Sequence, residues 1–332
     1  MKNPTISREK LLAVFVLVSF VFAIACQQQV ASITNSAAES KAEYKDSAFD
    51  AKRAFDHMKK VVDFGPRPSG SPAIKKTQEY IINELRSYGL KVMEDDFQGK
   101  TPKGAISMKN IFAELPGEKS DVVIISGHYD TKILANFVGA NDGGSSTAAV
   151  LETARVLAGT KPEYTLWFVF FDGEEAVVEW TGDDNTYGSR HMVAKMKADG
   201  TLGKIRAMIL YDMIGDKQLD LKRDGQSSKW LVDTIWRTAA QTLYAKHFLG
   251  NETYMSDDHV PFVEAGIPAV DLIDFNYGPD HTYWHTAQDT LDKVSGESVK
   301  AVGEVVIQSL PEIYKQLDAR AANKPSTPNK SE

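Results

Sequence analysis

The sequence is poor in cysteine: Cys26 is the only one in 332 residues. No intrachain disulfide can form, so the fold must be stabilised by packing and hydrogen bonding. Acidic residues outnumber basic residues by 45 to 38, giving a formal net charge of −7, which argues against nucleic acid as a main partner. No segment repeats at the spacing of solenoid units. With 42% hydrophobic residues, the chain can bury one large core or two small ones.

Long apolar runs are also scarce, and the one at the N-terminus, from Leu11 to Ala25, follows a basic start. This pattern is typical of a secretory signal, and the run is short for a membrane span. We therefore predict a signal peptide at residues 1–25. Ala23-Ile24-Ala25-Cys26 resembles a bacterial lipobox, with Cys26 as the lipidated residue and its lipid as the only membrane contact. An uncleaved anchor helix would give the same topology, so we expect a bacterial protein that is exported, either periplasmic or anchored as a lipoprotein.

The remaining chain divides into three predicted parts. Residues 26–43 are rich in Gln, Ser and Ala and predict a flexible tether. Residues 44–317 alternate apolar and polar segments and predict one folded domain. Residues 318–332 are polar, and we expect a disordered tail there.

The folded domain is organised around the segment from Thr165 to Phe171. Its residues are apolar or prone to form strands, without period-two alternation, so we predict a strand buried on both faces. Asp172-Gly173 signals a turn, and the two carboxylates Glu174 and Glu175 follow it. Ligands of open α/β sheets bind at this edge, although an acidic turn in solvent would have the same sequence.

Apolar periodicity predicts the other elements. Helices are expected at 47–64, 73–88, 147–157, from 189, at 229–246, 257–264 and 294–317, and strands at 92–97, 107–115, 122–125, 205–211 and 269–273. This alternation predicts an α/β fold, a single domain with a central mixed, mostly parallel β-sheet flanked by helices on both faces.

Acidic and imidazole groups follow the predicted strands, at His128/Asp130, Glu174/Glu175, Asp212 and, after a longer loop, His285. Asp142 precedes a helix, where an ordinary N-cap would also be acidic. A buried, hydrogen-bonded histidine would explain any one of these residues, but not their recurrence at several strand ends. Imidazoles and carboxylates without a thiolate suit zinc or a similar metal, so we predict a metal site.

Several motifs are spread over residues 127–286. They are Gly-His-Tyr-Asp at 127–130, Phe-Val-Gly-Ala-Asn-Asp at 137–142, Phe-Phe-Asp-Gly-Glu-Glu-Ala at 170–176, Tyr-Gly-Ser-Arg-His at 187–191, Asp-Met-Ile-Gly at 212–215, Asp-Asp-His-Val-Pro-Phe at 257–262 and Trp-His-Thr at 284–286. With them, the run from about residue 47 to 316 resembles the zinc aminopeptidase superfamily (peptidase family M28-like). Within it, the run most resembles the glutaminyl-peptide cyclotransferases (glutaminyl cyclases).

The resemblance implies a zinc-dependent catalytic domain, but two branches share its ligands. In two-zinc aminopeptidases, both ions would be held by the positions of His128, Asp142, Glu175, Asp212 and His285. Asp142 would bridge the ions, and Glu174 would be the base. In glutaminyl cyclases, one zinc would sit on Asp142, Glu175 and His285, leaving His128 and Asp212 as the second-metal alternative.

Three features resemble the cyclase branch. Residues 176–187 lengthen the loop after the acidic pair and carry Trp180, Asp257 stands where peptidases have Ser or Thr, and Trp284 precedes His285. Core packing of the tryptophans and an N-cap role for Asp257 are the ordinary alternatives. By contrast, the Gly-Gly-Ser-Ser run at 143–146 looks peptidase-like, and the disulfide of animal cyclases cannot form here.

The resemblance implies that an N-terminal glutamine of a peptide or protein becomes pyroglutamate with release of ammonia. Glu174 would move the proton, and Asp257 would hydrogen-bond to Glu174 and Asp212 in a chain that shares a proton. Trp180 and Trp284 would wall the substrate pocket. The alternatives are a di-zinc aminopeptidase that releases N-terminal amino acids, and a catalytically silent binding lipoprotein, which would not need Glu174.

Overall fold

The computed structural model describes residues 47–323. The predicted signal peptide, the predicted tether and the lipid site at Cys26 lie outside the described residues. Within 47–323, no helix combines the length and apolarity needed to cross a lipid bilayer.

The centre of the domain is a six-stranded sheet in the order β1-β2-β4-β3-β5-β8. The strands are β1 (Lys91–Thr101), β2 (Gly104–Leu115), β3 (Lys119–His128), β4 (Tyr164–Phe171), β5 (Ile205–Asp212) and β8 (Ala269–Ile273). β4, β3, β5 and β8 are parallel, while β1 and β2 form an antiparallel hairpin joined to β4. The predicted mixed, mostly parallel sheet is confirmed.

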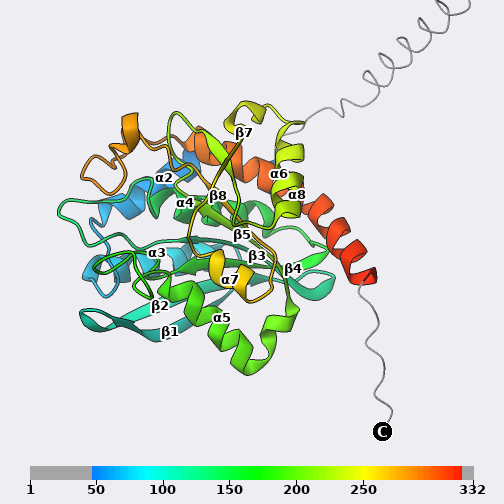
Figure 1. The fold of residues 1–332 in the computed structure, drawn as a ribbon, viewed down its shortest axis with the longest axis horizontal. Coiled ribbons are helices and arrows are strands. Elements are labelled where there is room, and N and C mark those ends of the chain that lie inside the picture. Colours follow the sequence, from blue (N-terminus) through cyan, green and yellow to red (C-terminus); the bar gives the residue numbers. More distant parts are fainter. Residues whose placement is uncertain (1–46, 324–332) are drawn as a thin grey trace, which may run out of the picture. The chain divides into compact units, whose positions relative to one another are not determined.

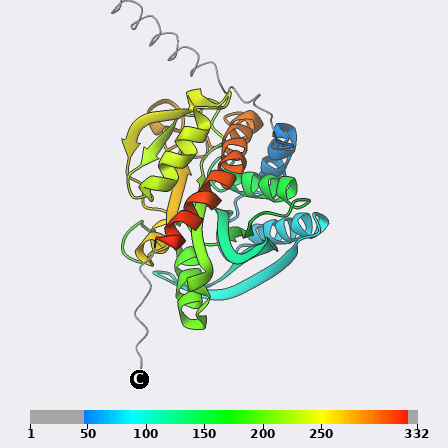
Figure 2. The ribbon, with the colours of Figure 1, turned by 90° about the vertical axis from the view of Figure 1, so that its right-hand side faces the viewer.

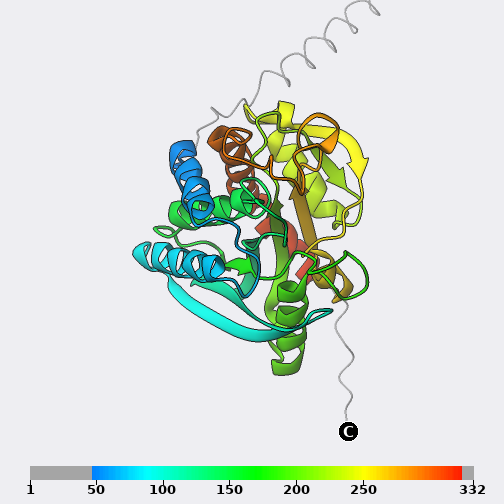
Figure 3. The same ribbon diagram turned by 90° about the vertical axis from the view of Figure 1, so that its left-hand side faces the viewer.

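Helices cover both faces of this sheet (Figure 1). One face packs against α2 (Ala51–Asp63), α3 (Pro72–Ser87), α4 (Gly144–Leu157), α6 (Lys229–Ala239) and α8 (Gly296–Ala322). The other face packs against α5 (Tyr187–Asp199) and α7 (Val260–Glu264). Helix α8 lies against α2 and α4 (Figure 2), and α3 packs between α4 and the β1–β2 hairpin (Figure 3).

Strand β4 explains why its sequence does not alternate with period two. Leu166, Phe168 and Phe170 pack into the core beneath the α2–α4–α8 layer. Val169 and Phe171 pack into the second core, beneath α5 and α7. A strand covered on both faces needs apolar residues at successive positions.

The structure differs from the predicted elements in several places. A small parallel sheet of β6 (Leu221–Asp224) and β7 (Phe248–Thr253) was not predicted. Helix α6 ends at Ala239, before a short 3₁₀ turn at Ala245–His247. There the Thr242 hydroxyl donates to the Ala239 carbonyl and accepts the Tyr244 amide, offering the backbone an alternative to helix. Further 3₁₀ turns span Thr201–Lys204 and Pro279–His281.

The predicted start of the disordered tail at 318 is wrong, because α8 continues to Ala322. The Asp318 carboxylate accepts hydrogen bonds of 2.6 Å from Lys119 Nζ and from the Tyr164 hydroxyl. Two residues further, the Arg320 guanidinium lies 4.5 Å from the centre of a Trp230 ring. These tertiary contacts extend the helix into a segment whose sequence is polar.

Candidate active site

Three neighbouring parallel strands bring the polar residues of the candidate site to one edge of the sheet. β3 ends at His128, β5 ends at Asp212, and β4 is followed by the turn at Asp172-Gly173. Gly173 has a φ of 72°, and a Cβ there would lie 2.7 Å from the sulfur of Met108. The turn therefore requires glycine, and it directs the chain so that Glu174 and Glu175 follow at the same edge.

Asp142, Glu175 and His285 form the first group of potential metal ligands. Nε2 of His285 lies 3.2 Å from Oδ2 of Asp142 and 3.1 Å from Oε1 of Glu175. Asp142 does not cap the following helix, because the N-cap residue of α4 is Gly143 and no side chain caps that end. Its carboxylate instead faces the two histidines of the site.

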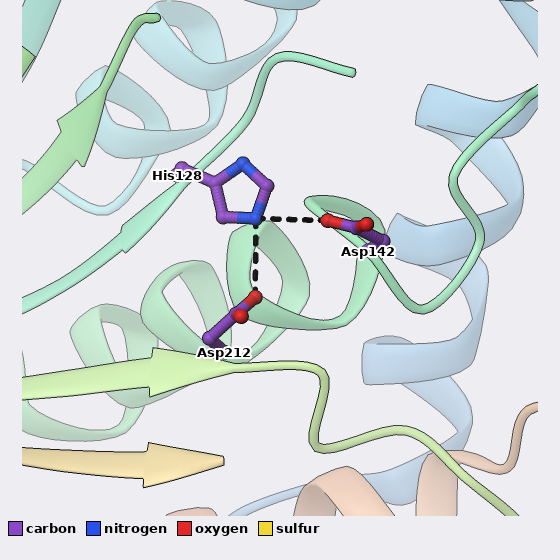
Figure 4. A group of neighbouring side chains, drawn as sticks. All are labelled: His128, Asp142 and Asp212. Carbon is purple, nitrogen blue, oxygen red and sulfur yellow. Dashed lines mark hydrogen bonds and ion pairs between the residues drawn. The ribbon is translucent and has the colours of Figure 1, made fainter. Parts of the chain in front are cut away.

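His128, Asp142 and Asp212 form a second group, drawn in Figure 4. Nε2 of His128 lies 3.2 Å from Oδ1 of Asp142 and 3.1 Å from Oδ1 of Asp212. Asp142 belongs to both groups, with one oxygen facing each histidine. The fold therefore assembles both of the ligand sets that the sequence left open.

The first group fits a bound metal ion. Nitrogen and oxygen ligands about 2.1 Å from a tetrahedral metal stand roughly 3.4 Å apart, close to the separations between these side chains. Oδ2 of Asp142 and Oε2 of Glu175 are buried and accept no hydrogen bond of good geometry within residues 47–323, although Nε2 of His285 lies 3.2 Å from the first and Nζ of Lys132 lies 3.5 Å from the second. Buried polar atoms normally have a partner, and a cation would supply it.

The pKa shifts in this group also fit a site for a metal ion. Burial opposes a charge on His285, but its contacts with Asp142 and Glu175 outweigh burial and raise its pKa to about 9. Burial also opposes ionisation of Asp142, yet the close imidazoles of His128 and His285 hold its pKa well below the usual range. Burial and the charge of Asp142 raise the pKa of Glu175 instead, so a bound metal ion would supply the positive charge that favours ionisation of both carboxylates.

The buried carboxylate of Asp130 binds the backbone of the acidic pair Glu174 and Glu175. Its two carboxylate oxygens accept the backbone amides of Glu174 at 3.1 Å and Glu175 at 3.3 Å. One of the same oxygens lies 3.5 Å from Nδ1 of His128. One buried carboxylate thus sets the positions of residues from β3 and from the turn after β4.

Glu174, Asp212 and Asp257 are all buried carboxyl groups. Burial and neighbouring carboxylates raise the pKa of Glu174 and of Asp257 well above the usual values, and burial raises the pKa of Asp212. The predicted hydrogen bonds from Asp257 to Glu174 and Asp212 are absent among the contacts of the described residues. Oδ1 of Asp257 instead accepts the amide of Asp258 at 2.5 Å, so this part of the prediction is wrong. The groups interact through their charges rather than by direct hydrogen bonds.

A cavity of about 330 Å³ opens over these residues. All of the residues predicted for catalysis, substrate binding and the first metal group line it: Asp142, Glu174, Glu175, Trp180, Asp212, Asp257, Trp284 and His285. His128 does not line it and is buried behind the others. The structure thus brings the predicted residues together, while their individual roles stay predictions.

The two tryptophans wall the cavity in different ways. Trp284 stacks on the ring of His285, with centroids 4.0 Å apart, and meets Phe275 edge-on at 4.8 Å. Trp180 is 36% exposed and lies on the loop after β4. Asp184 shapes that loop by accepting three consecutive backbone amides, those of residues 177–179.

The sequence did not indicate several residues of the site. Lys132 places its ammonium 3.5 Å from Oε2 of Glu175, and Phe275, Ile273 and Met255 add apolar wall. Lys132 follows β3 closely, and Phe275 follows β8 closely. Both residues follow strand ends, but a lysine or a phenylalanine at such a position does not by itself indicate a metal site.

The fold and the paired ligand groups define a class of metal-dependent α/β enzymes with the site at the carboxyl ends of parallel strands. Residues 110–310 match the model of peptidase family M28. A glutaminyl cyclase from an Acidobacteriales bacterium is 37% identical, covers 84% of this chain and 99% of its own, and superposes with a TM-score of 0.78. The glutaminyl-peptide cyclotransferase of Drosophila melanogaster is 28% identical over 268 residues, covering 72% of this chain and 75% of that protein.

A leucine aminopeptidase precursor from Bacteroides thetaiotaomicron is 26% identical, covers 80% of this chain and 98% of its own, and has a TM-score of 0.73. The backbone is therefore similar to proteins named for either activity. By its family match and its identity to a solved cyclase, the chain belongs to peptidase family M28 and, within it, to the glutaminyl cyclases. The resemblance inferred from the sequence is confirmed.

Proposed function

We propose that this protein is a glutaminyl-peptide cyclotransferase, which converts the N-terminal glutamine of peptides or proteins to pyroglutamate with release of ammonia. One observation carries the proposal. One small cavity is lined by the buried carboxyl groups of Glu174 and Asp257, by the Asp142–Glu175–His285 group, and by Trp180 and Trp284. A glutaminyl side chain needs such an apolar slot, and its α-amine needs a nearby acceptor.

Glu174 performs the proton transfer in this proposal. The α-nitrogen forms a bond to the carbon of the side-chain amide, and the bond from that carbon to the amide nitrogen breaks. Glu174 takes a proton from the α-amine and returns it to the leaving nitrogen, which departs as ammonia. Its raised pKa suits a group that must both accept and donate a proton near neutral pH.

In this proposal, the carboxyl groups of Asp257 and Asp212 favour the protonated form of Glu174. Carboxyl groups packed this closely cannot all ionise, so the cluster retains a proton. Burial raises the pKa of Glu174 most; the charge of His128 opposes this shift, and the charge of Asp257 adds to it. The aromatic walls hold the glutaminyl chain folded, so that attack on its own amide costs little orientational entropy.

We infer that the metal is zinc, held by Asp142, Glu175 and His285. Two carboxylates and one imidazole, with no thiolate, suit zinc. A zinc ion there would polarise the side-chain carbonyl and stabilise its developing negative charge.

A two-zinc aminopeptidase is the second candidate, and the assembled His128–Asp142–Asp212 group favours it. Two measurements on purified protein separate the candidates. Release of ammonia from a glutamine-initiated dipeptide, with about one zinc per chain, supports the cyclase. Near two zincs per chain, with release of amino acids from peptide p-nitroanilides and no cyclisation, supports the peptidase.

We further infer export to the bacterial periplasm or to a membrane surface. The support is the basic and apolar N-terminal pattern followed by Ala-Ile-Ala-Cys at 23–26. Metabolic labelling with a fatty acid, compared between the wild type and Cys26→Ser, tests whether Cys26 carries a lipid.

A further inference from the structure

The loop that carries Asp142 is held by a fully buried positive charge. The guanidinium of Arg67 donates hydrogen bonds to the carbonyls of Val138 at 2.5 Å and Gly139 at 2.8 Å, and reaches that of Asp142 at 3.5 Å. It also donates to the carbonyl of Tyr129 at 2.9 Å, just beyond β3. No carboxylate forms an ion pair with Arg67 among the described residues, so backbone carbonyls satisfy this charge.

A buried carboxyl group holds the same loop through its amides. Asp289 accepts the N–H of Asn141 at 2.8 Å and of Asp142 at 3.0 Å, and the hydroxyl of Tyr277 at 2.7 Å. Its own amide donates to the carbonyl of Thr286 at 3.1 Å, directly after His285. Asp289 therefore connects the loop of one proposed ligand to the loop of another.

The glycines of the loop make room for the guanidinium. Cβ atoms at Gly139 and Gly143 would lie 3.4 Å and 3.3 Å from Nη2 of Arg67, and both would clash with nearer backbone oxygens. Both residues have positive φ, 52° and 77°, which glycine adopts at little cost. The chain thus wraps around Arg67 at close range, which explains the glycines at positions 139 and 143.

We propose that Arg67 and Asp289 are positioning residues that fix the backbone at Asp142 and thereby set the affinity of the site for zinc. This inference rests on the proposed metal site, and neither residue touches the metal or the substrate. Arg67 binds the carbonyl side of the loop and Asp289 binds its amide side, so the Asp142 carboxylate faces both histidines before any ion arrives. Groups behind metal ligands commonly contribute tenfold to a hundredfold in metal affinity.

The test is Asp289→Asn, an isosteric change that replaces one accepting oxygen by an amide donor opposed to a backbone N–H. We expect zinc affinity, measured by competition with a chelator well below the melting temperature, to fall by roughly 10–100-fold. Tyr277→Phe removes only the hydroxyl and should destabilise the fold less than Asp289→Asn. We expect it to lower zinc affinity by about threefold to tenfold. Arg67→Lys keeps the charge but loses the fork of donors, and it should also weaken zinc binding.

Glu304→Gln is the matched control. Glu304 on α8 is also fully buried and accepts the backbone amide and the hydroxyl of Ser47, outside the loops of Asp142, Glu175 and His285. It should lower the melting temperature of the metal-stripped protein without changing zinc affinity. Unchanged zinc affinity in Asp289→Asn and Tyr277→Phe, with thermal destabilisation like that of the control, overturns the proposal. Because zinc binding is read without turnover, this failure is distinct from an absence of cyclase activity.

Discussion

The two ligand groups share Asp142 but differ in their access to substrate. The outer group adds Glu175 and His285, and the His285 side chain is 17% exposed in the wall of the cavity. The inner group adds His128 and Asp212, and the His128 side chain is 1% exposed behind it. A catalytic metal keeps a position open for substrate, and the outer group meets that condition. Ligand spacing alone therefore does not decide how many ions act, whereas access to the cavity does distinguish the groups.

The aminopeptidase precursor has nearly the same backbone as the cyclase. Its TM-score of 0.73 against 0.78 for the Acidobacteriales cyclase shows that nearly the same backbone serves both kinds of protein. A difference in chemistry between them must then lie in side chains and local loops rather than in the overall backbone. Four substitutions probe the outer group, the groups above it and the inner group.

The largest effect is expected from His285→Ala in the outer group. Losing one of three ligands should release the zinc, and turnover should fall by more than roughly 10⁴-fold, the upper range for loss of a general base. Elemental analysis and ammonia release measure the two effects. A metal-free variant that still cyclises glutamine would contradict the assignment of the outer group.

Glu174→Gln comes next and separates the two adjacent acids. Replacing the proposed base should lower kcat by roughly 10²–10⁴-fold while zinc stays bound. The control is Glu175→Gln, which should lose zinc because it alters a proposed ligand. If Glu174→Gln also loses its metal, Glu174 belongs to the ligands and the roles must be reassigned.

Asp257→Ser should have an intermediate effect. Removing this neighbour should lower the pKa of Glu174, since Asp257 is one of the charges that raise it, and slow turnover by about tenfold to a hundredfold. The lost carboxyl group also leaves Asp212 freer to bind, so zinc content should rise above one ion per chain at high zinc concentration. Full cyclase activity in this variant removes Asp257 from the mechanism.

His128→Gln in the inner group should have the smallest effect on catalysis. Zinc content and ammonia release should stay close to wild type, because the proposed ion lies in the outer group. Stability should fall by about 1–3 kcal/mol, because the buried carboxylates of Asp142 and Asp212 lose a partner; urea unfolding measures this. Loss of zinc and activity comparable to His285→Ala would favour the two-ion site.

Much of the fold was predictable because buried strands and helices have characteristic local patterns of apolar residues. The uninterrupted apolar run of β4 follows from its burial on both faces, and the helical spacing before Gly65 gives α2. The shorter α6 and the longer α8 were mispredicted, because Thr242 and Asp318 act through contacts that spacing does not reveal.

The sequence by itself determined which chemical groups are present and that they follow strand ends, since motif and strand pattern are both local. It also indicated the cyclase branch through Trp180, Asp257 and Trp284. Only the tertiary structure decided which groups meet. It separated His285 in the cavity from His128 behind it, replaced the expected bonds of Asp257, and revealed Arg67 and Asp289 on the Asp142 loop. Such contacts join residues far apart in the chain, and their distances depend on how the loops pack.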